Sequence, residues 1–303
     1  MVFVEQDRRG AFVKASSFQF HRASSRSETL EMLAALEGAK IIAGGQSLVA
    51  MLNMRYAFVD HLIDINGVEG LAGVDVGPNE IRIGAMTRQR DILASPALRT
   101  RAPVVAEALR FVGHLHTRNR GTLGGSLGHM DPAAELMAVV TLLDATVHVE
   151  SARGARDVAI ADYPQAYMTP ALEPDELIVG ATLRPPATGH GWSFREFAQR
   201  HGDFAVVAVG ATIALDGAGK VSDARIVLSG VGFAPRRLAE AERMLASEAP
   251  GEALFAAVAA QATREEALSD AMASEAYRKH LAGVLTRRAV AEALARAKHG
   301  FVQ

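Results

Sequence analysis

The sequence contains no cysteine among its 303 residues. Without thiolates the chain forms no disulfide bonds and lacks the usual protein ligands of iron–sulfur clusters. It also lacks a cysteine nucleophile. If the protein takes part in redox chemistry, an organic cofactor must carry that chemistry, and any metal centre must be held by another chain.

Other features are absent as well. A net charge of −2 leaves no basic surface of the kind that binds nucleic acid. No apolar run approaches the roughly 18 to 20 residues that a membrane-spanning helix needs. The N-terminal segment is charged and has no apolar core typical of a secretory signal. We therefore expect a cytoplasmic globular protein, long enough for two or three compact units.

Two glycine-rich stretches stand out in what the sequence does contain. Residues 41–54 read IIAGGQSLVAMLNM, and residues 121–135 read GTLGGSLGHMDPAAE. Each places a Gly-Gly pair and a hydroxyl residue between an expected strand and an expected helix. Glycine at such a position lets backbone N–H groups converge on an anion without a Cβ in the way. Either stretch alone is also compatible with a simple tight turn, but the pair predicts two loops that together hold one pyrophosphate.

Familiar nucleotide-binding patterns are missing. The chain has no G-x-x-x-x-G-K-[ST] and no G-x-G-x-x-G, which argues against a P-loop ATPase or a Rossmann dehydrogenase. His114 and His116 alternate as a metal-binding pair does, and His129 follows, but no acidic residue stands beside the pair at ligand spacing. We favour hydrogen-bonding or solvated histidines. Arg118 and Arg120 either assist phosphate binding or are ordinary surface charge.

Local signals place the first and last elements of the expected fold. Ser47 is expected to cap the helix after the first loop, and Asp131 the helix that contains Glu135. Residues 183–191, rich in proline, are the candidate linker. Beyond it, residues 204–215 and 225–231 are expected strands on either side of Asp-Gly-Ala-Gly, a hairpin signal. Three helices are expected to close the chain, over residues 235–246, 252–266 and 275–298.

Four segments resemble the FAD-binding medium subunit of the molybdenum hydroxylases. They are AGGQSLVAMLNMR at residues 43–55, RNRGTLGGSLGHMDPAAEL at 118–136, PDEL at 174–177 and GDFA at 202–205. That family includes CO dehydrogenase, xanthine dehydrogenase and aromatic or N-heterocycle hydroxylase complexes. The resemblance runs from about residue 17 to about residue 297 in the expected order.

The resemblance implies an α+β fold. It would consist of a two-part, PCMH-like FAD-binding domain followed by a smaller α+β C-terminal domain with an antiparallel sheet and helices. After an N-terminal extension at residues 1–13, the two FAD-binding subdomains would cover residues 14–70 and 71–188, and the C-terminal domain residues 189–303.

The resemblance also implies a set of cofactor-binding residues, with no catalytic side chain and no metal ligand. Glu135 would bind near a ribityl or ribose hydroxyl, and Leu177 would lie against the cofactor. Arg195 would stand near the isoalloxazine, and Phe204 would cover one face of it. The whole expected set is Ala43, Gly44, Gly45, Gln46, Ser47, Leu48, Thr87, Gly121, Thr122, Gly124, Gly125, Ser126, Asp131, Glu135, Leu177, Arg195, Asp203 and Phe204.

The implied function is electron transfer within a complex. A large molybdopterin-binding subunit would oxidise the substrate, and a small subunit would carry [2Fe-2S] clusters. FAD on this chain would pass the electrons to an external acceptor: NAD, oxygen, a quinone or a carrier protein. The complex would be a dimer of heterotrimers. Two alternatives stay open: a self-sufficient FAD-dependent oxidoreductase with its own substrate, and a nucleotide-binding regulatory protein without flavin chemistry.

Overall fold

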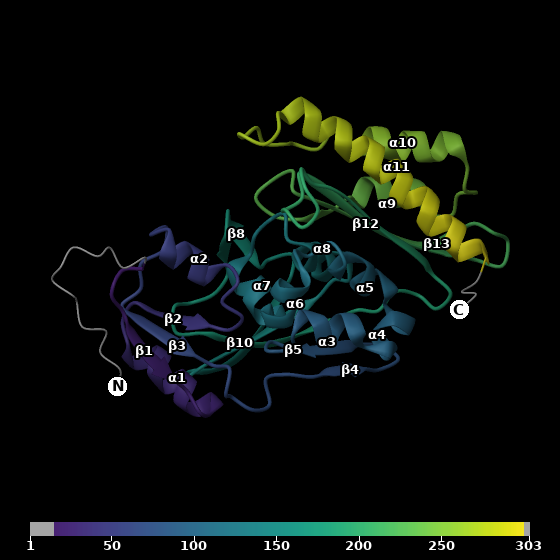
Figure 1. Ribbon diagram of the computed structural model, residues 1–303. Coiled ribbons are helices and arrows are strands. Elements are labelled where there is room, and N and C mark those ends of the chain that lie inside the picture. The colour runs from purple at the N-terminus through teal and green to yellow at the C-terminus, as the bar shows by residue number, and fades with distance from the viewer. Residues whose placement is uncertain (1–14, 300–303) are drawn as a thin grey trace.

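The structure, a computed structural model, describes residues 15–299 and builds them around three main sheets (Figure 1). The extension expected at residues 1–13 lies outside the described residues. The mixture of helices with parallel and antiparallel sheets confirms the expected α+β class.

The first sheet is parallel, with strands in the order β1-β3-β2: β1 (Gln19–Arg22), β3 (His61–Asp64) and β2 (Ala39–Ile42). Helix α1 (Arg26–Ala35) crosses from β1 to β2, and α2 (Leu48–Asn53) crosses from β2 to β3. The hydroxyl of Ser25 caps α1 by accepting from the Glu28 N–H. Because the strands are parallel, the segment between β2 and α2 leaves the sheet at its carboxyl edge, where α/β sheets bind ligands.

The second sheet is antiparallel, in the order β4-β5-β10-β6-β7. Its strands are β4 (Val74–Val76), β5 (Ile81–Gly84), β10 (Leu177–Leu183), β6 (Thr146–Ser151) and β7 (Gly154–Ala159). A two-stranded hairpin, β8 (Pro164–Ala166) with β9 (Thr169–Pro170), lies between β7 and β10 in the chain. The central strand β10 follows all the helices of this unit in the sequence, yet it lies between β5 and β6 in the sheet.

Short helices connect β5 to β6: α3 (Gln89–Ala94), α4 (Pro96–Arg101), α5 (Pro103–Leu109), α6 (Leu115–Arg120), α7 (Leu123–His129) and α8 (Glu135–Leu142). All residues of α8 are buried, which explains why its sequence is apolar on every side. The expectation that Asp131 caps this helix is wrong. Helix α8 begins at Glu135, and the Asp131 carboxylate instead accepts a hydrogen bond from the Ala133 N–H at 2.8 Å.

The C-terminal unit contains an antiparallel sheet in the order β11-β12-β13-β14. Its strands are β11 (Gly191–Phe197), β12 (Val207–Leu215), β13 (Val221–Ser229) and β14 (Arg236–Arg237). The expected hairpin joins β12 to β13, where Asp216 Oδ1 accepts from the N–H groups of Ala218 and Lys220. Three helices follow: α9 (Ala239–Leu245), α10 (Glu252–Ala262) and α11 (Glu275–His299).

The two faces of the C-terminal sheet have different neighbours. Figure 1 shows α10 and α11 on its outer side and α5 and α8 on its inner side, above the second sheet. Trp192 and Phe194 of β11 are buried in the core shared with α5 and α8, whereas Val209 and Ala211 of β12 are buried in the core that contains α11. Side chains that alternate along β11 therefore point either to the first half of the chain or to α11.

Candidate functional site

The two glycine-rich loops lie against each other. A Cβ added at Gly44 would overlap the carbonyl oxygen of Arg120 and lie 3.0 Å from the Cα of Gly121. A Cβ at Gly125 would lie 3.9 Å from the Cβ of Ala43. Segments far apart in the sequence thus meet at the carboxyl edge of the parallel sheet, and the contact is close enough to require glycine at residue 44.

A short hydrogen-bond chain fixes the spacing of the loops. The Asn66 side chain donates to the carbonyl oxygen of Ala43 at 2.9 Å and accepts from Arg88 at 2.6 Å. Arg88 also donates to the carbonyl oxygen of Arg120. Sequence reasoning missed Asn66 and Arg88. The signal available for Asn66 was its position directly after a second parallel strand, at the same edge as the first loop.

The first loop has unused hydrogen-bond donors. No atom of residues 15–299 accepts a hydrogen bond from the backbone N–H groups of residues 44–48. The chain turns here through Gly45, whose φ of +75° favours glycine. Ser47 stands at the N-cap of α2, but its side chain makes no capping hydrogen bond, so the expected cap is wrong. Unpaired consecutive N–H groups at a left-handed turn are the donors of an anion-binding nest.

The second loop is different, because its backbone donors are used within the chain. The N–H groups of residues 123–126 are all bonded; their acceptors are, in chain order, the carbonyl oxygens of Thr87 and Ala85, the hydroxyl of Thr122 and the carbonyl oxygen of Thr122. This loop therefore contributes a rigid wall at Gly125, which is exposed, and the hydroxyl of Ser126. It does not supply free N–H groups from the first turn of α7.

Residues 85–89 hold the second loop in place through backbone hydrogen bonds. The hydroxyl of Thr87 is buried and bonded to Gly73, so Thr87 supports the loop through its carbonyl group. Gln89 binds the loop at the carbonyl oxygen of Gly121 through its backbone and at Ser126 through its side-chain amide. Its Oε1 atom is buried without a partner among the described residues. Sequence reasoning missed Gln89.

A pair of buried carboxyl groups lies where α8 meets β11. Glu135 is 5% exposed, and burial, helped by repulsion from Asp131, raises its pKa to about 7. Burial and the charge of Glu135 raise the pKa of Glu196 to about 8. Glu196 Oε2 is buried without a hydrogen-bond partner among the described residues. Sequence reasoning missed Glu196, although its alternation with Trp192 and Phe194 was visible.

Arg195 points the other way from Glu196. Its guanidinium pairs with Glu292 of α11 at 2.7 Å, on the outer side of the C-terminal sheet. Phe204 follows β11 and is 48% exposed, which leaves its ring available for a contact. Asp203 lies in the turn before it, where its N–H donates to the carbonyl oxygen of Arg200. Leu177 is buried in the core of the first sheet, beneath Ala43.

The structure gives no support to a metal at the histidines. Among residues 15–299 no three His, Asp or Glu side chains are grouped so that they could hold an ion. The His114 ring instead stacks on that of His201, with centroids 6.4 Å apart. No helix in the same part of the chain is both long and apolar enough to cross a membrane.

Comparisons with known proteins agree over nearly the whole chain. Residues 16–183 match the family described as "FAD binding domain in molybdopterin dehydrogenase", and residues 192–293 match the "CO dehydrogenase flavoprotein C-terminal domain". Subunit alpha of the 6-hydroxypseudooxynicotine dehydrogenase complex of Paenarthrobacter nicotinovorans is 37% identical, over 94% of this chain and 97% of its own length. The carbon monoxide dehydrogenase medium chain of Afipia carboxidovorans is 34% identical, over 93% of this chain and 99% of its own.

Solved structures show the same likeness. The chain superimposes on reconstituted CO dehydrogenase from Oligotropha carboxidovorans with a TM-score of 0.90 and 32% identity, covering 93% of this chain and 99% of that one. Quinoline 2-oxidoreductase from Pseudomonas putida 86 gives a TM-score of 0.89 at 32% identity, covering 94% and 99%.

Proposed function

The chain belongs to the FAD-binding medium subunits of the molybdenum hydroxylases, and on this premise we propose that its two glycine-rich loops hold the pyrophosphate of FAD. It is the flavoprotein component of an oxidoreductase complex that also has a large and a small subunit. Molybdopterin and the iron–sulfur clusters belong to those other subunits. The family membership supports this function over a self-sufficient oxidoreductase.

The observation that carries the proposal is the row of N–H groups at residues 44–48, which have no partner among residues 15–299 and belong to a loop that lies against the second loop. A pyrophosphate needs several donors and close approach of the backbone, and this turn offers both. Ala43, Gln46 and Leu48 complete the first loop. Gly121, Thr122, Gly124, Gly125 and Ser126 shape the opposite wall, with Thr87 supporting it from below.

Bound FAD would supply the redox chemistry, and the surrounding residues would position it and adjust its electrostatic environment. Glu135 and Asp131 lie where α8 begins and are suited to accept hydrogen bonds from sugar or ribityl hydroxyl groups. Phe204 would offer a flat apolar surface to the ring, with Asp203 shaping the turn. For Leu177 we propose an indirect contact through Ala43. Arg195 would act through the field of its charge, because its side chain is engaged with Glu292.

We further propose that the complex is a cytoplasmic dimer of heterotrimers that delivers electrons to an external acceptor. Relatives of this subunit are named for carbon monoxide, glyceraldehyde and caffeine dehydrogenases. One type of flavoprotein subunit thus accompanies very different substrates, which supports substrate choice by the large subunit. We also propose that residues 14–70 and 71–188 form the two FAD-binding subdomains and that residues 189–303 form the C-terminal domain.

The test is a bulky side chain at Gly125, where an added Cβ would meet the Thr122 hydroxyl at 2.9 Å and further atoms would extend toward Ala43. We expect Gly125→Leu to purify as folded but colourless protein. Gly128→Leu is the matched control, since Gly128 is exposed one turn along α7 and its Cβ would meet only the Ile178 side chain at 3.6 Å. Absorbance of bound flavin and circular dichroism are the measurements. A yellow Gly125→Leu protein with full FAD content would remove the second loop from the site.

A further inference from the structure

A cavity of about 690 Å³ lies where the linker joins the two units of the molecule. It is built from the turn before β5, the end of α4, the linker after β10 and the start of β13; its lining residues are Pro78, Asn79, Arg101, residues 184–188, Asp223 and Arg225. In the register of the second sheet, Leu183 pairs with Ile81 at this end, whereas Leu177 lies at the other end of β10 beneath the first glycine loop. The cavity is thus separate from the proposed FAD site.

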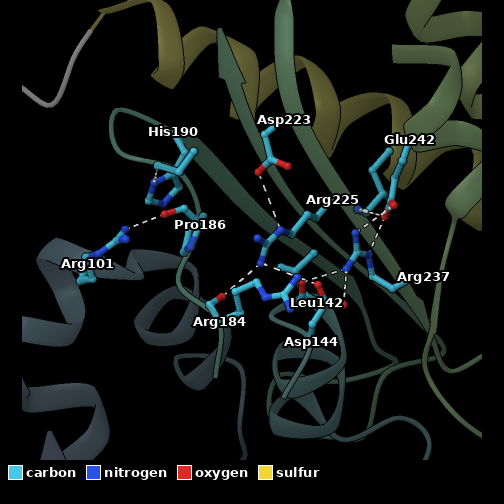
Figure 2. Close-up of polar contacts among 12 residues, drawn as sticks. Arg101, Leu142, Asp144, Arg184, Pro186, His190, Asp223, Arg225, Arg237 and Glu242 are labelled. Carbon is cyan, nitrogen blue, oxygen red and sulfur yellow. Dashed lines mark hydrogen bonds and ion pairs between the residues drawn. The ribbon is translucent and has the colours of Figure 1, made fainter. Parts of the chain in front are cut away.

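Arg225 is a buried cation whose nearest carboxylates lie beyond hydrogen-bond distance. It is 9% exposed, and its nearest carboxylate oxygens are those of Asp223 at 3.7 Å and Asp144 at 4.0 Å (Figure 2). Asp144 is also bound by Arg237 at 2.6 Å, which draws its charge away. A buried guanidinium normally has a carboxylate in direct hydrogen-bond contact, because its desolvation is otherwise uncompensated. Among residues 15–299, the one hydrogen bond of the Arg225 guanidinium goes to the carbonyl oxygen of Arg184, at 3.1 Å.

Two further arginines line the same cavity. Arg101 donates to the carbonyl oxygen of Pro186 at 2.6 Å (Figure 2). It also donates to that of Pro78 at 3.0 Å, so it holds the walls in place, and it makes no ion pair with the rest of residues 15–299. The Arg184 side chain is exposed and has no ion pair with the described residues. The lining therefore carries three arginines against one aspartate, an excess of two positive charges.

The remaining lining residues bring no further charge. Three proline rings, of Pro78, Pro185 and Pro186, supply rigid apolar walls. The cavity is also much larger than a single phosphate group, which leaves room for an organic substituent.

We propose that this linker cavity binds a phosphate dianion, either orthophosphate or the phosphate group of a small monoester. A phosphate monoester carries about two negative charges near neutral pH, matching the excess of the lining. One guanidinium group can donate two parallel hydrogen bonds to two oxygens of a phosphate, which the ammonium group of lysine cannot do. The ligand would connect α4, the linker and β13, and so fasten the two units to each other.

The test is calorimetric titration of the full-length chain saturated with FAD, so that the glycine loops are occupied. Sodium phosphate and adenosine 5′-monophosphate are the two probes, with sodium chloride at equal ionic strength as the blank. We expect saturable binding at one site, and a rise in melting temperature with phosphate. Tighter binding of the monoester than of phosphate identifies an organic ligand, and equal binding identifies orthophosphate.

The variants Arg184→Gln and Arg101→Gln should each weaken binding by about tenfold or more. Arg99→Gln is the matched control, because Arg99 is an exposed arginine on the same helix as Arg101 and does not line the cavity. FAD content should be unchanged in all three. The proposal fails if phosphate does not saturate below about 10 mM. It fails equally if Arg184→Gln and Arg101→Gln bind as tightly as Arg99→Gln.

Discussion

At the scale of single residues, the spacing of the two loops depends on a few polar side chains. Asn66 bonds the first loop at Ala43 and receives a hydrogen bond from Arg88, which in turn donates to the carbonyl group of Arg120. If the Asn66 side chain is shortened, both of its contacts are lost and the two loops are held together less tightly.

We therefore expect Asn66→Ala to raise the dissociation constant for FAD by about tenfold, the effect of losing about 1 to 2 kcal/mol of hydrogen bonding. Fluorescence titration of flavin-stripped protein measures it. Asn53→Ala is the control, since Asn53 is exposed at the end of α2. Equal affinities for the two variants would contradict a positioning role for Asn66.

The carboxyl groups of Glu135 and Glu196 predict a pH dependence of stability. Their folded-state pKa values of about 7 and about 8 lie above the ordinary value of 4.5, so the folded protein binds more protons than the unfolded chain between these limits. The free energy of unfolding should therefore fall as the pH rises from about 5 to about 9.

Glu196→Gln removes one ionisation and should flatten this dependence by about 2 kcal/mol. Urea denaturation at several pH values is the measurement. Glu248→Gln provides the reference, because Glu248 is exposed. If the curve of Glu196→Gln is as steep as that of the unmodified protein, Glu196 is not the group that titrates.

At the scale of elements, helix α11 packs directly on the backbone of β11. A Cβ at Gly191 would overlap backbone atoms of Ala293 and Ala297, so this strand begins with glycine for steric reasons. Gly191→Ala should cost about 3 kcal/mol or more, because neither backbone can move without disturbing the core on that side. Chemical denaturation checks this value. Gly217→Ala, in an open turn with no atom within 4 Å of the added Cβ, should change little. Equal stability of both variants would rule out the close packing.

Elements with a strong local signal were predictable. The hairpin at residues 216–219 and the three closing helices are present, because turn residues and helix patterns act over short distances. The start of α8 was not predictable. Asp131 has the residue type of a cap, but Ser229 and Gly230 bind the carbonyl group of Pro132 and hold this segment away from a helix. Ser47 was mispredicted for the same reason: its residue type is typical of a helix cap, but its side chain makes no capping hydrogen bond.

The residues of the candidate site likewise fall into those that the sequence predicts and those that it does not. The glycine loops could be recognised because Gly45 adopts a left-handed conformation and Gly44, Gly121 and Gly124 leave no room for a Cβ. Asn66, Gln89 and Glu196 were missed because each acts across a tertiary contact that no local pattern records. Arg195 and Glu196 differ by one position along β11, and only the packing of α11 decides which of the two faces the first half of the chain.

At the scale of the whole molecule, one arginine adds a polar link to the apolar core that the two units share. Arg296 of α11 pairs with Glu107 of α5 at 2.6 Å, donates to the carbonyl oxygen of Trp192 at 2.8 Å and lies over its ring. Glu107 belongs to α5 in the first half of the chain, and Trp192 belongs to β11 of the C-terminal sheet. Removing the charge would leave Glu107 partly buried and unpaired, which is costly.

Arg296→Met should lower the free energy of unfolding by about 3 kcal/mol. It should also lower the melting temperature, while the shared apolar core keeps unfolding in one transition. Arg287→Met is the control on the same helix, because Arg287 is exposed and pairs with Glu252 within that unit. Differential scanning calorimetry distinguishes the outcomes. An unshifted transition for Arg296→Met would contradict a stabilising role for this contact.

The unequal hydrogen bonding of the glycine loops has a consequence for the apoprotein. Residues 123–126 have their acceptors within the polypeptide, so their shape does not depend on a ligand. The N–H groups of residues 44–48 have no acceptor among residues 15–299, so water must satisfy them when no ligand is bound. On the proposal that these loops hold FAD, one of the two is preformed and binding orders a single short turn, which should make uptake of the flavin rapid.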